Sequence, residues 1–247
     1  MTTTERPTPV RVEVAEPAGD RFVTAALATL TVILLTYQLI ARAVIPPLAV
    51  FAALFAVAAA LVWRRSARWR LLVAGGVALV YLLGSVRFFV ANLAHPASPA
   101  SFLAEAFLLI TLLTVIAGVV VGLRGARPGQ RRPLAAAAVA LAAVAVAVST
   151  VAAMRVDSDL AQPGDVAIEV LHSAFPSRVA VPTEAPALWV DNQDPFHHTL
   201  VIDGTDVRAV LPASTAVRVP VELAPGRYRY WCDVPGHESM EGELDVG

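Results

Sequence analysis

Five long apolar segments constrain the fold of this chain more than any other feature of its sequence. They run from Phe22 to Val44, Pro46 to Trp63, Leu71 to Leu93, Ser101 to Leu123 and Leu134 to Met154. A helix needs about 20 apolar residues to cross the hydrocarbon core of a bilayer, and each segment is close to that length. The sequence therefore predicts a bundle of five transmembrane helices over residues 22–154, with the lipid bilayer as its surroundings.

The placement of arginine predicts how these helices are oriented. The loops RRSARWR (64–70) and RGARPGQRR (124–132) are rich in arginine, whereas the other two connections have almost none. Arginine-rich loops of membrane proteins lie in the cytoplasm. Both loops therefore predict the same orientation: the N-terminus is cytoplasmic, and the residues after Met154 are extracytoplasmic. Residues 1–21 are polar and contain proline, so we expect a disordered cytoplasmic tail.

Composition excludes several classes of protein. The chain is 57% hydrophobic and only 16% charged, against about 25% charged residues in ordinary soluble domains. A net charge of −1 without a basic stripe argues against nucleic acid as a partner. The single cysteine cannot form an internal disulfide or a cysteine-rich zinc or iron–sulfur site. Nothing in the sequence predicts the oligomeric state.

Two ionisable residues lie inside the predicted spans. Arg87 in the third segment and Glu105 in the fourth are at similar depth below the outer surface. An ionisable group at such a depth normally finds a partner or lines a pathway. We therefore expect these two side chains to form an ion pair.

The chain changes character after Met154. Residues 155–164 (RVDSDLAQPG) are polar and rich in turn formers, which indicates a linker. Short strand-like runs follow over residues 165–247: VAIEV, RVAV, ALWVD, HTLVI, VRAVL, AVRVPVEL, RYRYWC and EGELDV. Many short strands at this spacing are typical of an all-β sandwich, which would be the extracytoplasmic domain.

The stretch YWCDVPGHESM, residues 230–240, contains the only cysteine of the chain together with a histidine and a methionine. Two further histidines, His197 and His198, lie in FHHTLVI, where another predicted strand begins. The end of one strand and a loop between two others can meet at one pole of a sandwich. Two imidazoles, a thiolate and a weak axial thioether are the donor set of a blue-copper electron-transfer centre.

The segment APGRYRYWCDVPGHESMEGELDV resembles the C-terminal copper loop of the cupredoxins, and FPSRVAVPTEAPALWVDNQDPFHHTLVID resembles their upstream half. The resemblance covers residues 165–247 and not the five apolar segments. It implies a Greek-key sandwich that binds one mononuclear type I copper ion. By position, the copper ligands would be His198, Cys232, His237 and, axially, Met240.

Two further expectations come with this resemblance. His198 is preferred to His197 because the family's ligand directly precedes the residue that opens the next strand, here Thr199. The backbone N–H of Thr199 is expected to support the sulfur of Cys232. Since only two residues separate His237 from Met240, Glu238 and Glu241 are other candidates for the axial position.

The remaining histidines and the apolar residues near the site are also assigned. We expect His197 to be a neighbour of the site at the surface, and His95 and His172 to be ordinary surface residues. Four apolar residues are expected around the exposed edge of His237, as a docking patch or as plain loop packing: Pro195, Phe196, Val234 and Pro235.

The leading functional hypothesis is a membrane-bound cupredoxin that carries single electrons as Cu(I)/Cu(II) and is not an enzyme. Its partners would be redox proteins in the membrane or on the extracytoplasmic side. One alternative is a copper store or chaperone that delivers copper to a respiratory or periplasmic enzyme. Another is a structural module that no longer binds metal.

Overall fold

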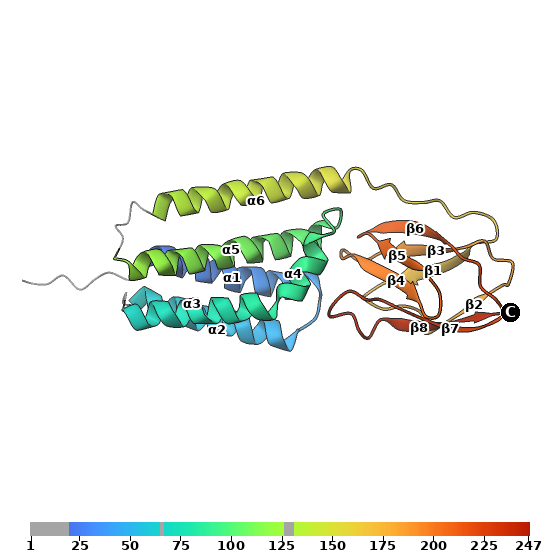
Figure 1. Cartoon of the computed structure of the whole chain (residues 1–247), viewed down its shortest axis with the longest axis horizontal. Coiled ribbons are helices and arrows are strands. Elements are labelled where there is room, and N and C mark those ends of the chain that lie inside the picture. The colour runs from blue at the N-terminus through green and yellow to red at the C-terminus, as the bar shows by residue number, and fades with distance from the viewer. Residues whose placement is uncertain (1–19, 65–66, 126–130) are drawn as a thin grey trace, which may run out of the picture.

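The computed structural model describes residues 20–64, 67–125 and 131–247, and Figure 1 shows two regions placed end to end. The helices described in the first region are α1 (Arg21–Ile40), α2 (Pro46–Arg64), α3 (Arg68–Gly84), α4 (Val86–Leu93), α5 (Pro99–Leu123) and α6 (Arg132–Ala153). Except for its last two residues, the predicted tail lies outside the described residues, as do 65–66 and 126–130 of the two arginine-rich loops.

Within the described ranges, four helices (α1, α2, α5 and α6) are each long and apolar enough to cross a membrane. A fifth span results if α3 and α4 count as one, but a bend of 59° separates them. The helical part of the predicted fold is thus confirmed, and the predicted third segment, Leu71 to Leu93, is divided between α3 and α4. The break falls at Ser85, directly after Gly84, and Gly/Ser pairs are a common cause of sharp helix kinks.

The core of the bundle is built from α1, α2, α3 and α5. Leu27, Leu30 and Leu34 line one face of α1 and are fully buried, and Phe55 of α2 and Leu112 of α5 pack into the same cluster. Their spacing along α1 is the period at which one face of a helix recurs. Helix α6 lies along α5 (Figure 1), and only Ser149 of its residues is buried.

Arg87 and Glu105 do not form the predicted ion pair. Oε1 of Glu105 instead accepts a hydrogen bond of 3.5 Å from the Asn92 amide. The guanidinium of Arg87 lies 4.7 Å from the ring centroid of Phe88. The prediction rested on similar depth in two spans, and Arg87 lies in the first turn of α4, after the break at Ser85.

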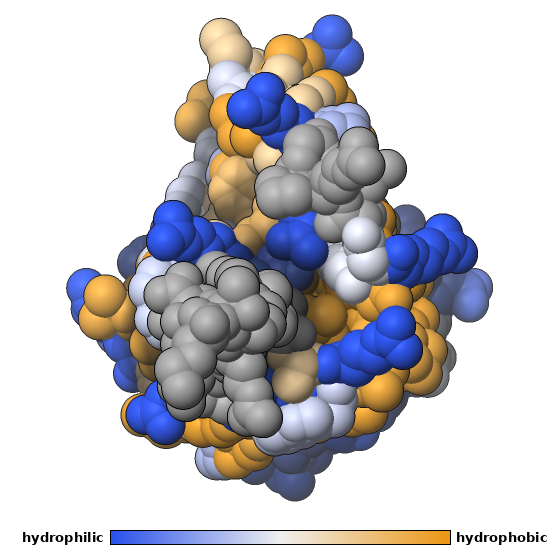
Figure 2. Space-filling view, turned by 90° about the vertical axis from the view of Figure 1, so that its left-hand side faces the viewer, coloured by the Kyte–Doolittle hydropathy of each residue, from blue (hydrophilic) through white to orange (hydrophobic). Residues whose placement is uncertain are grey.

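The two ends of the bundle differ in their surroundings. Helices α2 and α5 end, and α3 and α6 begin, at the end of the bundle far from the strands (Figure 1), and the sequence that joins each of these pairs is arginine-rich. Figure 2 shows this end, where hydrophilic side chains stand around apolar surface. The turn between α1 and α2, helix α4 and the end of α6 are at the opposite end, which faces the β domain.

Two sheets form the second region, so the predicted all-β sandwich is confirmed. Its strands are β1 (Val166–Val170), β2 (Arg178–Val181), β3 (Ala187–Asn192), β4 (His198–Ile202), β5 (Arg208–Leu211), β6 (Thr215–Pro220), β7 (Gly226–Trp231) and β8 (Glu241–Val246). One sheet has the order β1-β3-β6 and the other β2-β8-β7-β4-β5. Alternate residues of both sheets, among them Val190, Leu200 and Tyr230, are fully buried between them.

The segment predicted as a linker is attached to the sandwich in its second part. The backbone N–H of Asp159 donates to the carbonyl of Ala216 at 2.9 Å, and its carboxylate accepts from the N–H of Arg218 at 2.8 Å. The indole N–H of Trp189 donates to the Asp159 carbonyl. The connection from α6 to β1 therefore runs along β6 before it enters the sheet.

Candidate metal centre

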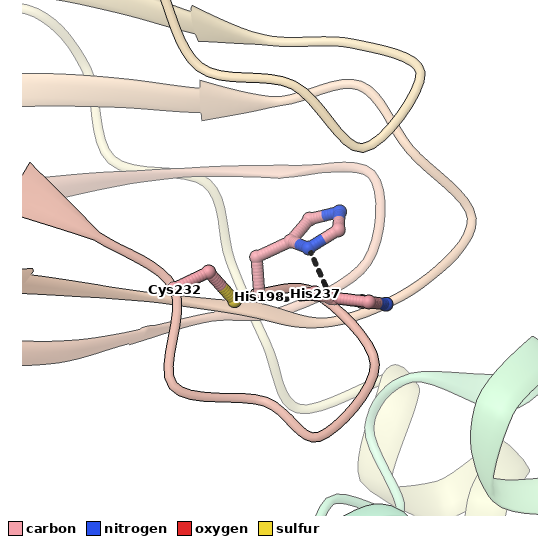
Figure 3. A group of neighbouring side chains, drawn as sticks. All are labelled: His198, Cys232 and His237. Carbon is pink, nitrogen blue, oxygen red and sulfur yellow. Dashed lines mark hydrogen bonds between the residues drawn. The ribbon is translucent and has the colours of Figure 1, made fainter. Parts of the chain in front are cut away.

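Three elements bring two imidazoles and the only thiol of the chain together. His198 is the first residue of β4, Cys232 directly follows β7, and His237 lies in the loop from β7 to β8 (Figure 3). Strands β4 and β7 pair with each other, so their ends meet at one edge. One ligand atom from each of the three residues lies within 4.8 Å of the others. It is the only such group of potential metal ligands among the described residues.

The distances within this group fit a small metal ion. Nδ1 of His198 is 3.1 Å from Nδ1 of His237, the contact dashed in Figure 3, and Sγ of Cys232 is 3.7 Å from Nδ1 of His237. Bonds of about 2.0–2.3 Å in a trigonal arrangement separate ligand atoms by about 3.5–3.8 Å. The S···N distance is in this range, and the N···N distance is shorter, so the two imidazoles would move slightly apart around an ion. Two imidazole nitrogens face each other here, and without a proton their lone pairs repel. A cation between them removes that repulsion.

Asp194 determines which nitrogen of His198 is free to bind. The Nε2–H of His198 donates to the Asp194 carboxylate at 3.0 Å, which leaves Nδ1 unprotonated and directed into the group. The backbone N–H groups of His172 and Ser173 donate to the same carboxylate, both at 2.7 Å. Such a partner fixes the tautomer and orientation of a ligating imidazole.

The carboxylate of Asp194 was not among the predicted site residues. It is 5% exposed and lies four residues before His198. The signal for it was the Asn192-x-Asp194 pair that precedes the histidines. Nδ2 of Asn192 donates to the carbonyls of Phe196, Leu211 and Pro212, and its Oδ1 accepts from the N–H of Asp194. Asn192 thus holds the turn that presents Asp194.

The sulfur of Cys232 is in an environment that favours the thiolate. Burial raises the pKa of this thiol, but hydrogen bonds with His198 and His237 and from the N–H of Thr199 outweigh burial and lower the pKa to about 5. The expected N–H···S contact of Thr199 is present at 3.4 Å. Because the thiolate is the form that binds metal, the site holds its soft ligand ready at neutral pH.

A hydrogen-bond network fixes the loop beyond Cys232. The hydroxyl of Thr199 is 2.7 Å from the carboxylate of Asp233, whose own N–H donates back to this hydroxyl at 2.8 Å. Arg208 donates to both oxygens of the same carboxylate, at 2.9 and 3.2 Å. Strands β4 and β5 thereby hold the start of the loop that carries His237.

The predicted axial residue Met240 lies directly before β8. It is 1% exposed and packs in the same core cluster as Cys232, and its carbonyl accepts from the N–H of Cys232 at 3.0 Å. The other two candidates, Glu238 and Glu241, are exposed, and Glu241 pairs with Arg229 at 2.6 Å. Of the three, Met240 is the one buried beside the sulfur ligand.

His197 is not at the surface, contrary to expectation. Only 1% of it is exposed, and its ring stacks on His95 of the bundle at 4.3 Å between centroids. Burial, followed by the neighbouring His95, lowers the pKa of His197 to about 3, so this imidazole is neutral. His172 is exposed, as expected. No local sequence pattern indicates the contact with His95, which joins two segments about a hundred residues apart.

The apolar residues around His237 face the helical bundle. Phe196 and Val234 are each 7% exposed, and the Phe196 ring lies 5.5 Å from that of Tyr37 in α1. A Cβ added at Gly236, beside His237, would lie 3.4 Å from the Phe88 ring in α4. Of the predicted patch, Phe196 and Val234 are therefore buried at the side that faces the helices, whereas Pro195 is exposed and Pro235 is half-buried.

These donors, their burial and the supporting carboxylate define a site that fits one mononuclear type I copper ion. The family model described as a cupredoxin-like domain matches residues 137–246, and the C-terminal part of the chain is accordingly a cupredoxin-like domain. Among solved structures, rusticyanin from Thiobacillus ferrooxidans is similar at 16% identity and a TM-score of 0.27, covering 37% of this chain and 87% of that one. No curated protein matches the chain.

Proposed function

We propose that the chain is a membrane-anchored blue copper protein that transfers single electrons on the extracytoplasmic face and has no catalytic site of its own. His198, Cys232 and His237 would hold the metal, with Met240 as the axial ligand. The observation that carries the proposal is the convergence of these donors inside a cupredoxin-like domain, with Asp194 fixing the tautomer of His198. Copper, when bound, supplies a one-electron Cu(I)/Cu(II) couple.

The protein contributes a rigid and dry site. Cys232 and His198 are almost fully buried, so water has little access to these two donors, and His237 is half-buried. Both sit at strand ends of one sheet, and Thr199 and Asn192 fix the adjoining loops through several hydrogen bonds. A ligand set that does not rearrange between oxidation states is what electron transfer requires of its scaffold.

Copper titration of the metal-stripped full-length protein in detergent tests this function. We expect one Cu(II) per chain, an intense blue colour, bleaching by ascorbate and recovery on reoxidation. Cys232→Ser is expected to remain colourless because it lacks the thiolate. His172→Asn is the matched control, since His172 is an exposed histidine outside the group and asparagine tolerates its positive φ of 57°.

Two other results would redirect the proposal. A wild-type protein that takes up Cu(I) without colour, and yields it to a competing apo-protein, indicates the copper store or chaperone. A protein that binds copper in neither state indicates the structural module. Either result contradicts electron transfer by this centre.

We further propose that the N-terminus is cytoplasmic and the β domain extracytoplasmic. The support is that the helix ends flanking both arginine-rich segments are at the end of the bundle far from the strands, together with the bias of cytoplasmic loops toward arginine. In a Cys232→Ser background, Asp157→Cys should react with a membrane-impermeant maleimide in intact cells. Arg124→Cys, equally exposed but at the other end, should react only after lysis. The reverse pattern contradicts this orientation.

A further inference from the structure

A large cavity lies where the helical bundle meets the candidate metal centre. Its volume is about 1190 Å³. Helices α1 to α5 supply one side of its lining, and the loops at 193–197 and 234–237 supply the other. His237 is among the lining residues, so a molecule in this cavity would be next to one of the proposed metal ligands.

The walls of the cavity are mostly apolar. Aromatic rings come from both sides: Tyr37, Phe51 and Phe88 from the helices and Phe196 from the β domain. Drug-sized ligands occupy sites of about 300–1,000 Å³ with mainly apolar linings and a few placed polar groups. This cavity has room for a ring with part of an aliphatic tail, and it lies at the end of the apolar bundle.

One of its polar groups is a buried carboxylate oxygen without a partner. Glu105 lines the cavity, and its Oε1 accepts from the Asn92 amide. Its Oε2 is buried and makes no hydrogen bond. An unmatched buried acceptor is costly, so it favours a ligand that brings a donor.

A second buried acceptor is on the opposite side. Ser101 has one hydroxyl hydrogen, which it donates to the carbonyl of Ser98 at 3.3 Å, so its oxygen accepts from Nδ1–H of His197, also at 3.3 Å. This assigns the proton of His197 to Nδ1 and leaves Nε2 as an acceptor. His197 lines the cavity, and its Nε2 is buried without a partner.

Two unmatched acceptors in an apolar cavity call for a ligand with two hydroxyl donors. We propose that the cavity binds a lipid-soluble hydroquinone, with its hydroxyl groups directed to Glu105 and His197. The choice of a redox-active diol over other amphipathic diols rests on the proposed function, because the ligand would lie beside a one-electron centre. The oxidised quinone carries only carbonyl acceptors, so it offers neither residue a donor and is expected to bind more weakly.

Binding of radiolabelled decyl-benzohydroquinone to the metal-free full-length protein tests this proposal under anaerobic conditions. The dimethyl ether of the same compound and its quinone are the matched ligands without O–H groups. We expect saturable binding of the hydroquinone, at least about tenfold tighter than either, as one to two lost hydrogen bonds imply. Glu105→Leu should weaken hydroquinone binding by about tenfold or more and leave binding of the ether unchanged.

Thr114→Val is the control variant on the same helix. Thr114 bonds only to its own helix and does not line the cavity, so hydroquinone binding should be unaffected. The proposal is overturned if the hydroquinone does not bind saturably, if its ether or quinone binds as tightly, or if Glu105→Leu binds it like the wild type. Copper titration of the same preparation separates the two proposals. A protein that turns blue with copper but does not bind the hydroquinone contradicts only the hydroquinone site. A protein that stays colourless but binds the hydroquinone contradicts only electron transfer by copper.

Discussion

At the scale of single residues, the site depends on a hydrogen bond that selects one nitrogen of an imidazole. Asp194 accepts from Nε2–H of His198 and from two backbone N–H groups. All of these contacts need acceptor oxygens, and a carboxylate supplies two. The geometry of the proposed copper site therefore depends on the turn before β4, which carries Asp194, as well as on the ligands themselves.

We predict that Asp194→Asn weakens copper binding by about 10- to 100-fold. The amide has only one oxygen, so it cannot accept from both His198 and the backbone donors, and its NH2 group favours the wrong tautomer of His198. Copper affinity is to be measured by competition with a chelator. Asp191→Asn is the control, because this nearby carboxylate bonds only to the Gln193 side chain. Equal affinities in the two variants would refute the role of Asp194.

The proposed ligands could be named from the sequence because they follow a local pattern. Cys232, His237 and Met240 lie within nine consecutive residues, and Thr199 marks His198 from the next position. The roles of His95 and Ser101 could not be predicted in this way. Their contacts with His197 depend on how the bundle meets the sandwich, which no local pattern encodes.

At the level of helices and strands, hydropathy predicted which residues form helices but not the angles between the helix axes. The apolar run from Leu71 to Leu93 is continuous in composition, yet it contains the Gly84-Ser85 pair at which α3 and α4 diverge by 59°. The period-two runs predicted the strands well, because a strand buried on one face leaves that pattern in its sequence. The ion pair expected between Arg87 and Glu105 was wrong, because similar depth in two helices does not determine which side chains meet.

An ion pair at the start of β1 makes the sandwich sensitive to acid. Nε and Nη2 of Arg218 donate to the carboxylate of Asp165, at 2.9 and 3.0 Å. These hydrogen bonds lower the pKa of Asp165 below its ordinary value of 3.8. The stabilisation is therefore complete above about pH 4 and is lost as the pH falls through the lower, folded-state pKa.

We predict that Asp165→Asn lowers the unfolding temperature of the β domain at pH 7 and reduces its loss of stability on acidification below pH 4. Calorimetry of the full-length protein across this pH range measures both effects. Asp245→Asn serves as the control, because that carboxylate is exposed and 4.0 Å from its arginine partner. An acid response that is the same in Asp165→Asn and the wild type would contradict this account.

At the scale of the whole molecule, the two regions are joined by specific contacts as well as by the chain. Ser98, before α5, is fully buried, and its hydroxyl oxygen accepts from the N–H of Ala213 at 3.0 Å. His95 stacks on His197, and Tyr37 contacts Phe196. These contacts surround the cavity and hold the proposed metal site against the bundle.

We predict that Ser98→Ala loosens this docking by about 0.5–1.5 kcal/mol, since the partly buried N–H of Ala213 loses its hydrogen-bond partner. Hydrogen exchange of the full-length protein should be faster at 212–214 and 234–237 and unchanged in the centre of the sandwich. Thr29→Val, which alters a hydroxyl bonded within α1, is the control. Unchanged exchange in Ser98→Ala would show that the two regions dock without this hydrogen bond.

The docked position of His237 has a kinetic consequence. A freely diffusing carrier meets each donor by collision, so its reduction speeds up with concentration and responds to ionic strength. His237 lines the cavity between the two regions, so under the proposed function a donor bound there would already lie beside it. Electron entry from that bound donor would be a unimolecular step, independent of ionic strength and protein concentration, whereas delivery to a partner in the aqueous phase would remain an encounter.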